Sequence, residues 1–371
     1  MRTTKGLYIH IPFCASKCAY CDFYSVSKDT NMMELYVDSL VEEIKKSSQF
    51  HSNDTIDTIY IGGGTPSVLP LYLLDKIVDA INKYYNLDLQ EFTMEANPSS
   101  NFDPADIKAF GIDRLSLGIQ TLNNRLLKLI GRLHDSKTAI ETLNRCAGVF
   151  NKISADLMIG LPTQTMDDVS ESVQTVSNLV NHVSVYMLKL SDNVPMAVNV
   201  RKGLYDLPDD DTFADFYDRT YEILKENGFQ RYEISNFSIA GFESKHNLKY
   251  WNRDDYIGLG AAAHGFVNEV RYVNPSDIHS YIAGNNYGNG LSEKTKISTK
   301  DAIFEKIMLA LRLPEGLDIN SFNNEFNLDF CSKYNKIINK LHGILKVQDG
   351  RAYILEDKML LESAVAREFL I

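Results

Sequence analysis

Three cysteines lie within one stretch of eight residues, as Cys14, Cys18 and Cys21 in the spacing C-x3-C-x2-C. Thiolates this close in the sequence can bind one metal centre together. A [4Fe-4S] cluster normally has four cysteine ligands. A site with three protein ligands leaves one iron open, and a substrate or cosubstrate can bind there.

Two other kinds of metal site fit these cysteines less well. A structural zinc site would add His10 as fourth ligand, and zinc ribbons usually have a second C-x2-C pair, which this sequence lacks. A ferredoxin-like electron carrier would be shorter and would have a fourth cysteine nearby. The other two thiols, Cys146 and Cys331, stand alone in helix-like segments, and we predict that both are buried and unreactive.

The elements that would position such a site follow a regular pattern over the first two-thirds of the chain. Short β-like segments alternate with segments whose apolar residues recur at helical spacing. Strands are predicted at residues 7–11, 58–61, 92–96, 114–119, 153–159, 183–190 and 231–235. Helices are predicted at residues 31–46, 71–84, 104–110, 136–146, 166–180 and 211–227. Repeated β-α units of this length predict a parallel α/β sheet, either open or barrel-like.

Residues that can do chemistry are found where these strands end. In parallel barrels the chemistry is carried by loops at the carboxyl ends of the strands. The sequence places the following groups there: the three cysteines, the triple glycine at residues 62–64, Glu95, Gln120 and Asp156. We therefore expect these groups to meet at one rim.

The last eighty residues have a different organisation. Residues 283–290 form a loop-rich stretch that we interpret as a linker. Helices at 301–311, 333–345 and 358–369 surround a predicted hairpin at 345–355 that turns at Asp349 and Gly350. A small helical unit with a β-wing suggests a winged helix. Residues 291–371 hold 12 Lys+Arg and 12 Asp+Glu, so they lack the basic surface of a DNA-binding domain.

Composition limits the class of protein further. The 371 residues are 44% hydrophobic and 23% charged, with a formal net charge of -11. This acidic balance argues against nucleic-acid binding and against anionic membranes. The polar N-terminus does not resemble a signal peptide, and no apolar run of about 20 residues is present. We therefore expect a cytoplasmic protein without disulfides.

The cysteine motif on the loop after the first strand resembles the signature of the radical SAM superfamily. The resemblance implies an α/β fold, namely an incomplete (β/α)6 barrel with a small C-terminal winged-helix-like α/β domain. It also implies that three irons of a [4Fe-4S] cluster are held by Cys14, Cys18 and Cys21. S-adenosylmethionine would chelate the fourth iron through its amino and carboxylate groups, and its reductive cleavage would yield a 5'-deoxyadenosyl radical.

Further motifs carry the resemblance over almost the whole chain. The closer similarity is to the coproporphyrinogen dehydrogenase-like branch and, within it, to the heme chaperone group HemW. It rests on YIHIPFC from Tyr8, CDF from Cys21, GGGTPS from Gly62, RLSLGIQ from Arg114, GRLH from Gly131, DLMIGLP from Asp156, YEISNF from Tyr232 and HNLKYW from His246. The residues that the resemblance places near S-adenosylmethionine are Tyr8, Tyr20, Gly63, Gly64, Thr65, Glu95, Gln120, Arg132, Asp156 and His264.

Some of these residues also have plainer interpretations. The glycine turn lacks the spacing of a P-loop or a Rossmann turn, and alone it would be only a tight turn. Arg132 and Asp156, which in the dehydrogenase match part of a second S-adenosylmethionine site, could form an ordinary ion pair at the rim. His264 could equally be a core histidine with satisfied hydrogen bonds.

Two features separate this chain from the dehydrogenase. The dehydrogenase has a fourth cysteine in its motif, where this chain has Phe23, and a long N-terminal extension, where only thirteen residues precede Cys14 here.

The resemblance also includes the HNxxYW motif, linked to heme binding, so His246, Tyr250 and Trp251 are expected to contact heme. An imidazole can ligate heme iron and an indole can pack on the macrocycle. The alternative is a hydrogen-bonded histidine in a packed loop.

The resemblance thus predicts a heme chaperone that binds one [4Fe-4S] cluster, S-adenosylmethionine and heme. It would deliver heme to client proteins such as respiratory enzymes, with a reductant protein if the cluster turns over. The alternative is an enzyme, an oxygen-independent coproporphyrinogen III dehydrogenase that decarboxylates propionates to give protoporphyrinogen IX. We expect the partial barrel at residues 1–237, the HNxxYW segment and linker at 238–290, and the C-terminal domain at 291–371.

Overall fold

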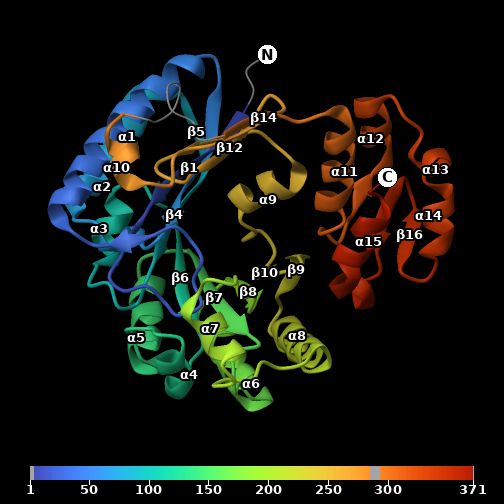
Figure 1. The fold of residues 1–371 in the computed structure, drawn as a ribbon, viewed down its shortest axis with the longest axis horizontal. Helices are drawn as coiled ribbons and strands as arrows, with labels where there is room; N and C mark the ends of the chain where they lie inside the picture. The colour runs from blue at the N-terminus through green and yellow to red at the C-terminus, as the bar shows by residue number, and fades with distance from the viewer. Residues whose placement is uncertain (1–3, 285–292, 371) are drawn as a thin grey trace.

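A computed structural model describes residues 4–284 and 293–370 of the protein, and within these ranges its main feature is one large sheet. Six strands of that sheet run parallel and lie side by side in chain order. They are β1 (Thr4–Ile11), β4 (Thr55–Gly63), β5 (Leu87–Ala96), β6 (Arg114–Gln120), β7 (Lys152–Ile159) and β8 (His182–Met187). The curved parallel array confirms the predicted incomplete (β/α)6 barrel (Figure 1).

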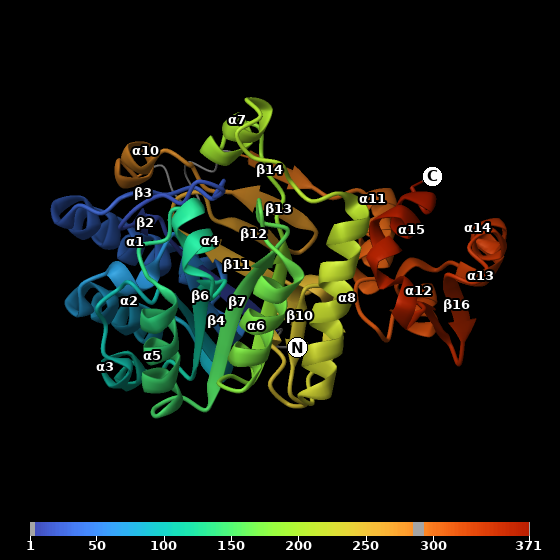
Figure 2. The same ribbon diagram turned by 90° about the horizontal axis from the view of Figure 1, so that it is seen from below.

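Helices cover the outer face of this array (Figure 2). They are α1 (Thr30–Phe50), α2 (Leu71–Tyr84), α3 (Pro104–Ala109), α5 (Ser136–Ala147), α6 (Met166–Ser177) and α8 (Asp210–Glu226). Two further helices, α4 (Asn124–Leu129) and α7 (Pro195–Arg201), belong to a separate apolar cluster beside the cysteine loop. Several begin where the sequence offers an N-cap. The side chains of Asp29, Asp135 and Asp209 each accept a hydrogen bond from a first-turn amide. The predicted helix at 71–84 is confirmed at both ends.

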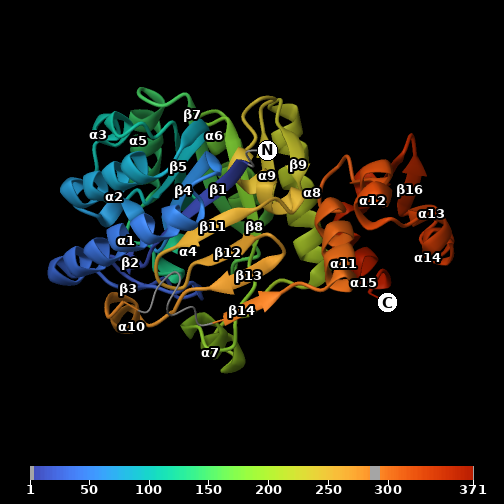
Figure 3. The same ribbon diagram turned by 90° about the horizontal axis from the view of Figure 1, so that it is seen from above.

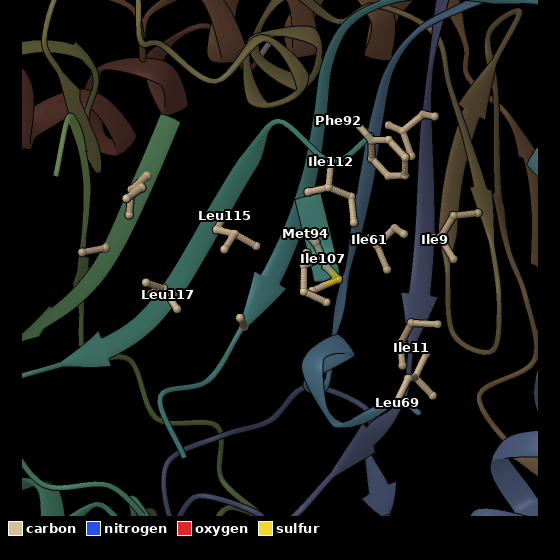
Figure 4. Packing of buried hydrophobic residues seen from close by; sticks show 14 of the residues in the cluster. Ile9, Ile11, Ile61, Leu69, Phe92, Met94, Ile107, Ile112, Leu115 and Leu117 are labelled. Atoms are coloured by element: carbon tan, nitrogen blue, oxygen red, sulfur yellow. The ribbon is translucent and has the colours of Figure 1, made fainter. Parts of the chain in front are cut away.

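The two faces of the parallel strands differ in polarity because successive side chains point to opposite sides. Apolar side chains pack under the helices, as Figure 4 shows for Ile9, Ile61, Met94, Leu115 and Leu117. The alternate positions carry buried polar groups, which are Thr58, Glu91, Thr93, Arg114, Ser116, Ser154, His182 and Ser184. The inner side of the barrel is therefore polar, and it can support a site.

Short strands extend the sheet beyond both edges of the parallel array. At one edge β11 (Tyr256–Leu259) runs parallel to β1 and is followed by the antiparallel strands β12 (His264–Val267), β13 (Val270–Val273) and β14 (Glu293–Lys296) (Figure 3). At the other edge lie β10 (Asn236–Ser238) and β9 (Gln230–Glu233). Of these strands only β9 overlaps a predicted strand, the one at 231–235. The others have three or four residues, which is generally too short for a periodic pattern to be recognised.

The C-terminal unit packs beside the barrel around its own apolar cluster, which includes Ile307, Phe322 and Phe330 (Figure 1). It comprises α11 (Thr299–Ala310), β15 (Leu317–Asp318), α12 (Ile319–Phe326), α13 (Phe330–Lys333), α14 (Asn335–Lys340), β16 (Leu345–Gln348), β17 (Arg351–Ile354), the 3-10 turn η2 (Glu356–Leu361) and α15 (Glu362–Glu368). The predicted hairpin is confirmed. Its turn residues Asp349 and Gly350 have φ of 52° and 76°, as a two-residue hairpin loop requires.

Three expectations for the C-terminal half need correction or fall outside the structure. The helix predicted at 333–345 is much shorter, because α14 spans only Asn335–Lys340 and residues 341–344 form turns. The preceding short helix α13 ends at Lys333, since Tyr334 leaves helical geometry and packs in the apolar cluster. Cys331 is exposed rather than buried, since α13 turns Phe330 inward and the next side chain faces solvent; Cys146 is buried as predicted. From residue 285 on, the predicted linker lies outside the described residues.

No helix in the described part of the chain is both long and apolar enough to span a lipid bilayer.

Candidate functional site

A cavity of about 590 Å³ lies at the carboxyl ends of the parallel strands, where the loops after β1 and β4 meet the ends of β5 to β8. Most of the site residues expected from the sequence line it. They are Cys14, Cys18, Tyr20, Cys21, Gly63, Gly64, Thr65, Glu95, Gln120, Arg132 and Asp156. Residues from the ends of several strands therefore line one cavity, as expected from their positions in the sequence.

The cysteine loop is held at the cavity by backbone hydrogen bonds. Cys14 ends β2 (Phe13–Cys14), which pairs with β3 (Val26–Ser27), and the amide of Ala19 donates to the carbonyl of Ile130 at 3.1 Å. All three thiols are free and partly exposed, and all three open to the same space. Three soft sulfur donors around one cavity fit an iron–sulfur cluster.

The geometry does not support the zinc alternative. His10, which would be the fourth ligand, is buried, and its Nδ1 lies 2.9 Å from the Tyr8 hydroxyl while its Nε2 lies 3.3 Å from the carbonyl oxygen of Tyr24. Within residues 4–284 and 293–370, no three His, Cys, Asp or Glu side chains meet around a single-ion position. The thiols instead border a larger space.

The glycine turn at the end of β4 lies against the cysteine loop so closely that side chains are excluded. A Cβ on Gly64 would lie 2.7 Å from the carbonyl oxygen of Phe13, and one on Gly63 would lie 2.7 Å from the His10 ring. Gly63 also has φ of +117°, which L-residues rarely adopt. The turn therefore presents backbone groups to the cavity at a position that only glycine can occupy.

Two carboxylates face the cavity from neighbouring parts of the sheet. Glu95 accepts hydrogen bonds from the Tyr60 hydroxyl at 2.8 Å and from the Gly63 amide at 3.0 Å. Asp156 accepts one from Ser116 at 3.2 Å. Burial and, secondarily, Asp156 raise the pKa of Glu95 to about 7, and burial raises the pKa of Asp156 to about 6. A cationic ligand in the cavity would lower both pKa values and so favour the ionised carboxylates.

Gln120 and Arg132 have buried polar atoms without a partner. Gln120 Oε1 and Arg132 Nε make no hydrogen bond, although both are enclosed. Arg132 donates to the carbonyl of Gly118 and lies 3.6 Å from Cys18 Sγ, and it forms no ion pair with Asp156 among the described residues. Buried polar atoms are normally satisfied, so unpaired ones beside a cavity indicate a bound polar ligand or water. The residues present therefore fit S-adenosylmethionine.

Two expected residues do not line the cavity. Tyr8 lies behind it, with its hydroxyl against His10 and its ring 6.2 Å from that of Tyr60. His264 is exposed at the start of β12. Lining residues that sequence reasoning missed include Ser116, Met158, and the end of β8 with the residues after it, which are Tyr186, Met187, Leu188, Lys189 and Ser191. Ser116 and Met158 lie within the motifs that begin at Arg114 and Asp156, and the residues from Tyr186 on were signalled only by their position at the end of a strand.

The HNxxYW residues also lie outside the cavity, on α9 (Lys245–Asn252). His246 is 0% exposed, with Nδ1 2.9 Å from Thr58 Oγ1 and Nε2 2.8 Å from the Tyr250 hydroxyl. Burial lowers the pKa of His246 to about 3, so the ring is neutral. Trp251 packs under the Arg312 guanidinium, 4.4 Å from the ring centroid. In this conformation neither nitrogen of His246 is open to a heme iron.

Comparisons with known proteins agree with this geometry. The model of the Radical SAM superfamily matches residues 8–176, and the model of the HemN C-terminal domain matches residues 297–352. Among curated proteins, heme chaperone HemW of Lactococcus lactis subsp. lactis (strain IL1403) is 40% identical, with 100% of this chain and 98% of that protein aligned. Heme chaperone HemW of Bacillus subtilis (strain 168) is 34% identical over 99% of each.

The chain belongs to the HemW family. Membership confirms the resemblance to radical SAM proteins and implies a [4Fe-4S] cluster and S-adenosylmethionine as cofactors. A solved structure of coproporphyrinogen III oxidase (HemN) from Escherichia coli, described as a radical SAM enzyme, superposes with a TM-score of 0.88 over 99% of this chain and 90% of that chain. At 21% identity this likeness shows only that the two chains share a fold, and not a substrate.

Proposed function

We propose that this protein is a cytoplasmic heme chaperone. It would hold a [4Fe-4S] cluster on Cys14, Cys18 and Cys21, bind S-adenosylmethionine in the adjoining cavity, and bind heme for delivery to client proteins such as respiratory enzymes. The observation that carries the proposal is the end-to-end similarity, at 40% identity, to a protein named as a heme chaperone. Phe23 supports it: the related dehydrogenase has a fourth cysteine there, and this side chain is 67% exposed beside the cavity.

Different residues of the cavity would bind different parts of the cofactors. A cluster with one open iron supplies one-electron reduction of the S-adenosylmethionine bound to it. Gly63 and Gly64 allow the backbone to approach the ligand, and Glu95 and Asp156 provide negative charge for its ammonium and sulfonium groups. Gln120 and Arg132 supply the polar atoms that lack a partner in the protein.

The ionisation of Glu95 predicts that S-adenosylmethionine binding depends on pH. A cation binds the carboxylate, which exists above the pKa, so affinity is lost as pH falls through the value of about 7. We expect the dissociation constant measured anaerobically by calorimetry to be about tenfold higher at pH 6 than at pH 8. Glu95→Gln should bind more weakly and show a flatter profile. Equal pH dependence in wild type and Glu95→Gln would contradict this role.

Delivery of heme can be tested with the reconstituted protein. The protein is loaded with heme, separated from free heme by gel filtration, and mixed with membranes from heme-deficient cells that contain heme-free respiratory enzymes. The proposal predicts faster recovery of respiratory activity than with the same concentration of free heme. Recovery no faster than with free heme, from a sample with the cluster intact, would contradict a chaperone role.

The second candidate is an enzyme, oxygen-independent coproporphyrinogen III dehydrogenase. It is retained because the model of the HemN C-terminal domain matches residues 297–352. Lys17 and Lys189 line the cavity and could pair with propionate groups of either heme or coproporphyrinogen. The position of Phe23 weighs against the enzyme, because the resembling dehydrogenase has a cysteine there.

A further inference from the structure

Helix α9 lies on the inner, concave side of the sheet, against the amino-terminal halves of β1, β4 and β5 and away from the cavity (Figure 1). The carboxylate of Glu91, on the inner face of β5, holds the first turn of α9. It accepts hydrogen bonds from the Ser244 hydroxyl at 3.0 Å and from the amides of Lys245 and His246 at 3.0 and 3.1 Å. The same carboxylate pairs with buried Arg114 at 3.1 Å. The position of His246 is therefore fixed by the sheet itself.

The imidazole of His246 is one member of a cluster of rings inside the barrel. Its centroid is 5.3 Å from that of Tyr60 with the two rings inclined by 30°, and Tyr60 is also stacked with Tyr8 at 6.2 Å. The Tyr250 ring packs edge-on against the His246 ring, with 5.1 Å between the centroids. The Tyr250 hydroxyl and His246 Nε2 share a hydrogen bond. The Tyr60 ring is thus held in place by its neighbours on α9 and β1.

The hydroxyl of Tyr60 connects this ring cluster to the cavity. It donates to Glu95 Oε1 at 2.8 Å, while Glu95 Oε2 accepts from the amide of Gly63. A shift of the Tyr60 ring would release one oxygen of Glu95 and move the carboxylate that faces the cavity. Two contacts therefore connect His246 to Glu95, namely a ring contact and a hydrogen bond.

The other aromatic residue of the motif faces the C-terminal unit. Trp251 lies under Arg312, which also pairs with buried Glu233 at 2.7 Å. His246 and Tyr250 thus pack against each other within the protein, and Trp251 packs against Arg312. The buried Nε1 of Trp251 has no hydrogen-bond partner among the described residues.

We infer that His246 is a positioning residue for the S-adenosylmethionine site: its ring supports Tyr60, and Tyr60 orients Glu95 toward the glycine turn. In this arrangement its two ring nitrogens are engaged by Thr58 and Tyr250 rather than by a heme iron. The inference rests on the proposed function insofar as S-adenosylmethionine binds beside Glu95. It assigns the HNxxYW helix a role at a site on the opposite end of the barrel.

Three variants separate positioning from heme ligation. His246→Phe keeps a ring against Tyr60 but has no nitrogen to bind iron, His246→Ala removes the ring, and Tyr60→Phe removes only the hydroxyl that meets Glu95. Lys245→Ala, at an exposed position on the same helix, is the matched control. Each protein is reconstituted anaerobically and titrated with S-adenosylmethionine and, separately, with heme.

We expect His246→Ala and Tyr60→Phe to raise the dissociation constant for S-adenosylmethionine about tenfold, which corresponds to about 1.4 kcal/mol. His246→Phe should stay within about threefold of wild type, because the ring contact is kept. All variants should bind heme with the wild-type absorbance spectrum and affinity. Because the Tyr60 hydroxyl stabilises the carboxylate, its loss should also shift the pH dependence of S-adenosylmethionine binding upward.

The pH measurement has to allow for the other groups that face Glu95. Those that act on its charge or are influenced by it are Asp156 on β7, Tyr8 on β1, Tyr60 on β4, Tyr186 on β8 and Tyr250 on α9. The Tyr60→Phe shift is therefore compared with Asp156→Asn, which removes a neighbouring negative charge. That variant should move the midpoint in the opposite direction, downward.

The outcomes distinguish the inference from the proposed function. Wild-type affinity for S-adenosylmethionine in both Tyr60→Phe and His246→Ala would overturn the positioning role. Loss of heme binding in His246→Phe, with S-adenosylmethionine binding intact, would make His246 a heme ligand instead. If His246→Ala does not fold, Tyr60→Phe and His246→Phe still decide between the two roles. Wild-type protein that holds its cluster but does not bind S-adenosylmethionine would contradict the proposed function itself.

Discussion

Anaerobic reconstitution of Cys14→Ala, Cys18→Ala or Cys21→Ala should yield protein without the broad visible absorbance of a [4Fe-4S] cluster. The three thiols open to one cavity, and a site that begins with only three cysteine ligands cannot lose one and still hold the full cluster. Iron and acid-labile sulfide should fall from about four of each per chain to near zero.

The chain supplies a matched control for these cysteine variants. Cys331 is exposed on α13, in the C-terminal unit, so Cys331→Ala removes a free thiol without touching the cavity. It should reconstitute like the wild type. A full cluster in any one of the three motif variants would contradict the ligand assignment, and loss of the cluster in Cys331→Ala would show that the assay reports general damage.

The second large effect is expected inside the barrel, at Arg114. This side chain is 1% exposed and donates to Glu91 at 3.1 Å, to Ser154 at 3.1 Å and to the carbonyl of Phe242 at 2.7 Å. Arg114→Met would leave the Glu91 carboxylate as an unpaired buried charge. Breaking a buried pair in this way costs about 3–5 kcal/mol.

Unfolding in urea, followed by circular dichroism, tests this expectation. The transition that reports the barrel should move to a much lower urea concentration in Arg114→Met. Arg125→Met is the control, because Arg125 is half exposed and its pair with Asp168 is worth at most about 1 kcal/mol. A similar, small shift in both variants would show that the Glu91–Arg114 pair does not stabilise the barrel.

The amino-acid sequence is sufficient to predict the parts of the fold that repeat. Alternating β and α periods locate the six parallel strands, and the rule that chemistry lies at strand ends correctly predicts that Glu95, Gln120 and Asp156 meet at one cavity. The glycine turn and the cysteine loop are placed for the same reason. These predictions depend on local pattern and on a general property of parallel sheets.

What the sequence could not predict depends on contacts between distant segments. His246 meets Thr58, 188 residues away, and the direction of its side chain follows from the docking of α9 on the inner face of the sheet. Cys331 required knowledge of which face of a four-residue helix is buried. His264 begins a four-residue strand whose position between β11 and β13 depends on pairing with both. The sequence motifs do not specify how these three side chains are placed.

The central claim is tested most directly by incubating the reconstituted protein anaerobically with S-adenosylmethionine, a strong reductant and coproporphyrinogen III. The products are then separated by chromatography, and a parallel sample from the same preparation is titrated with heme. The account predicts saturable heme binding and no protoporphyrinogen IX. Formation of protoporphyrinogen IX by the cluster-loaded protein would contradict it and would make the protein a tetrapyrrole-pathway enzyme.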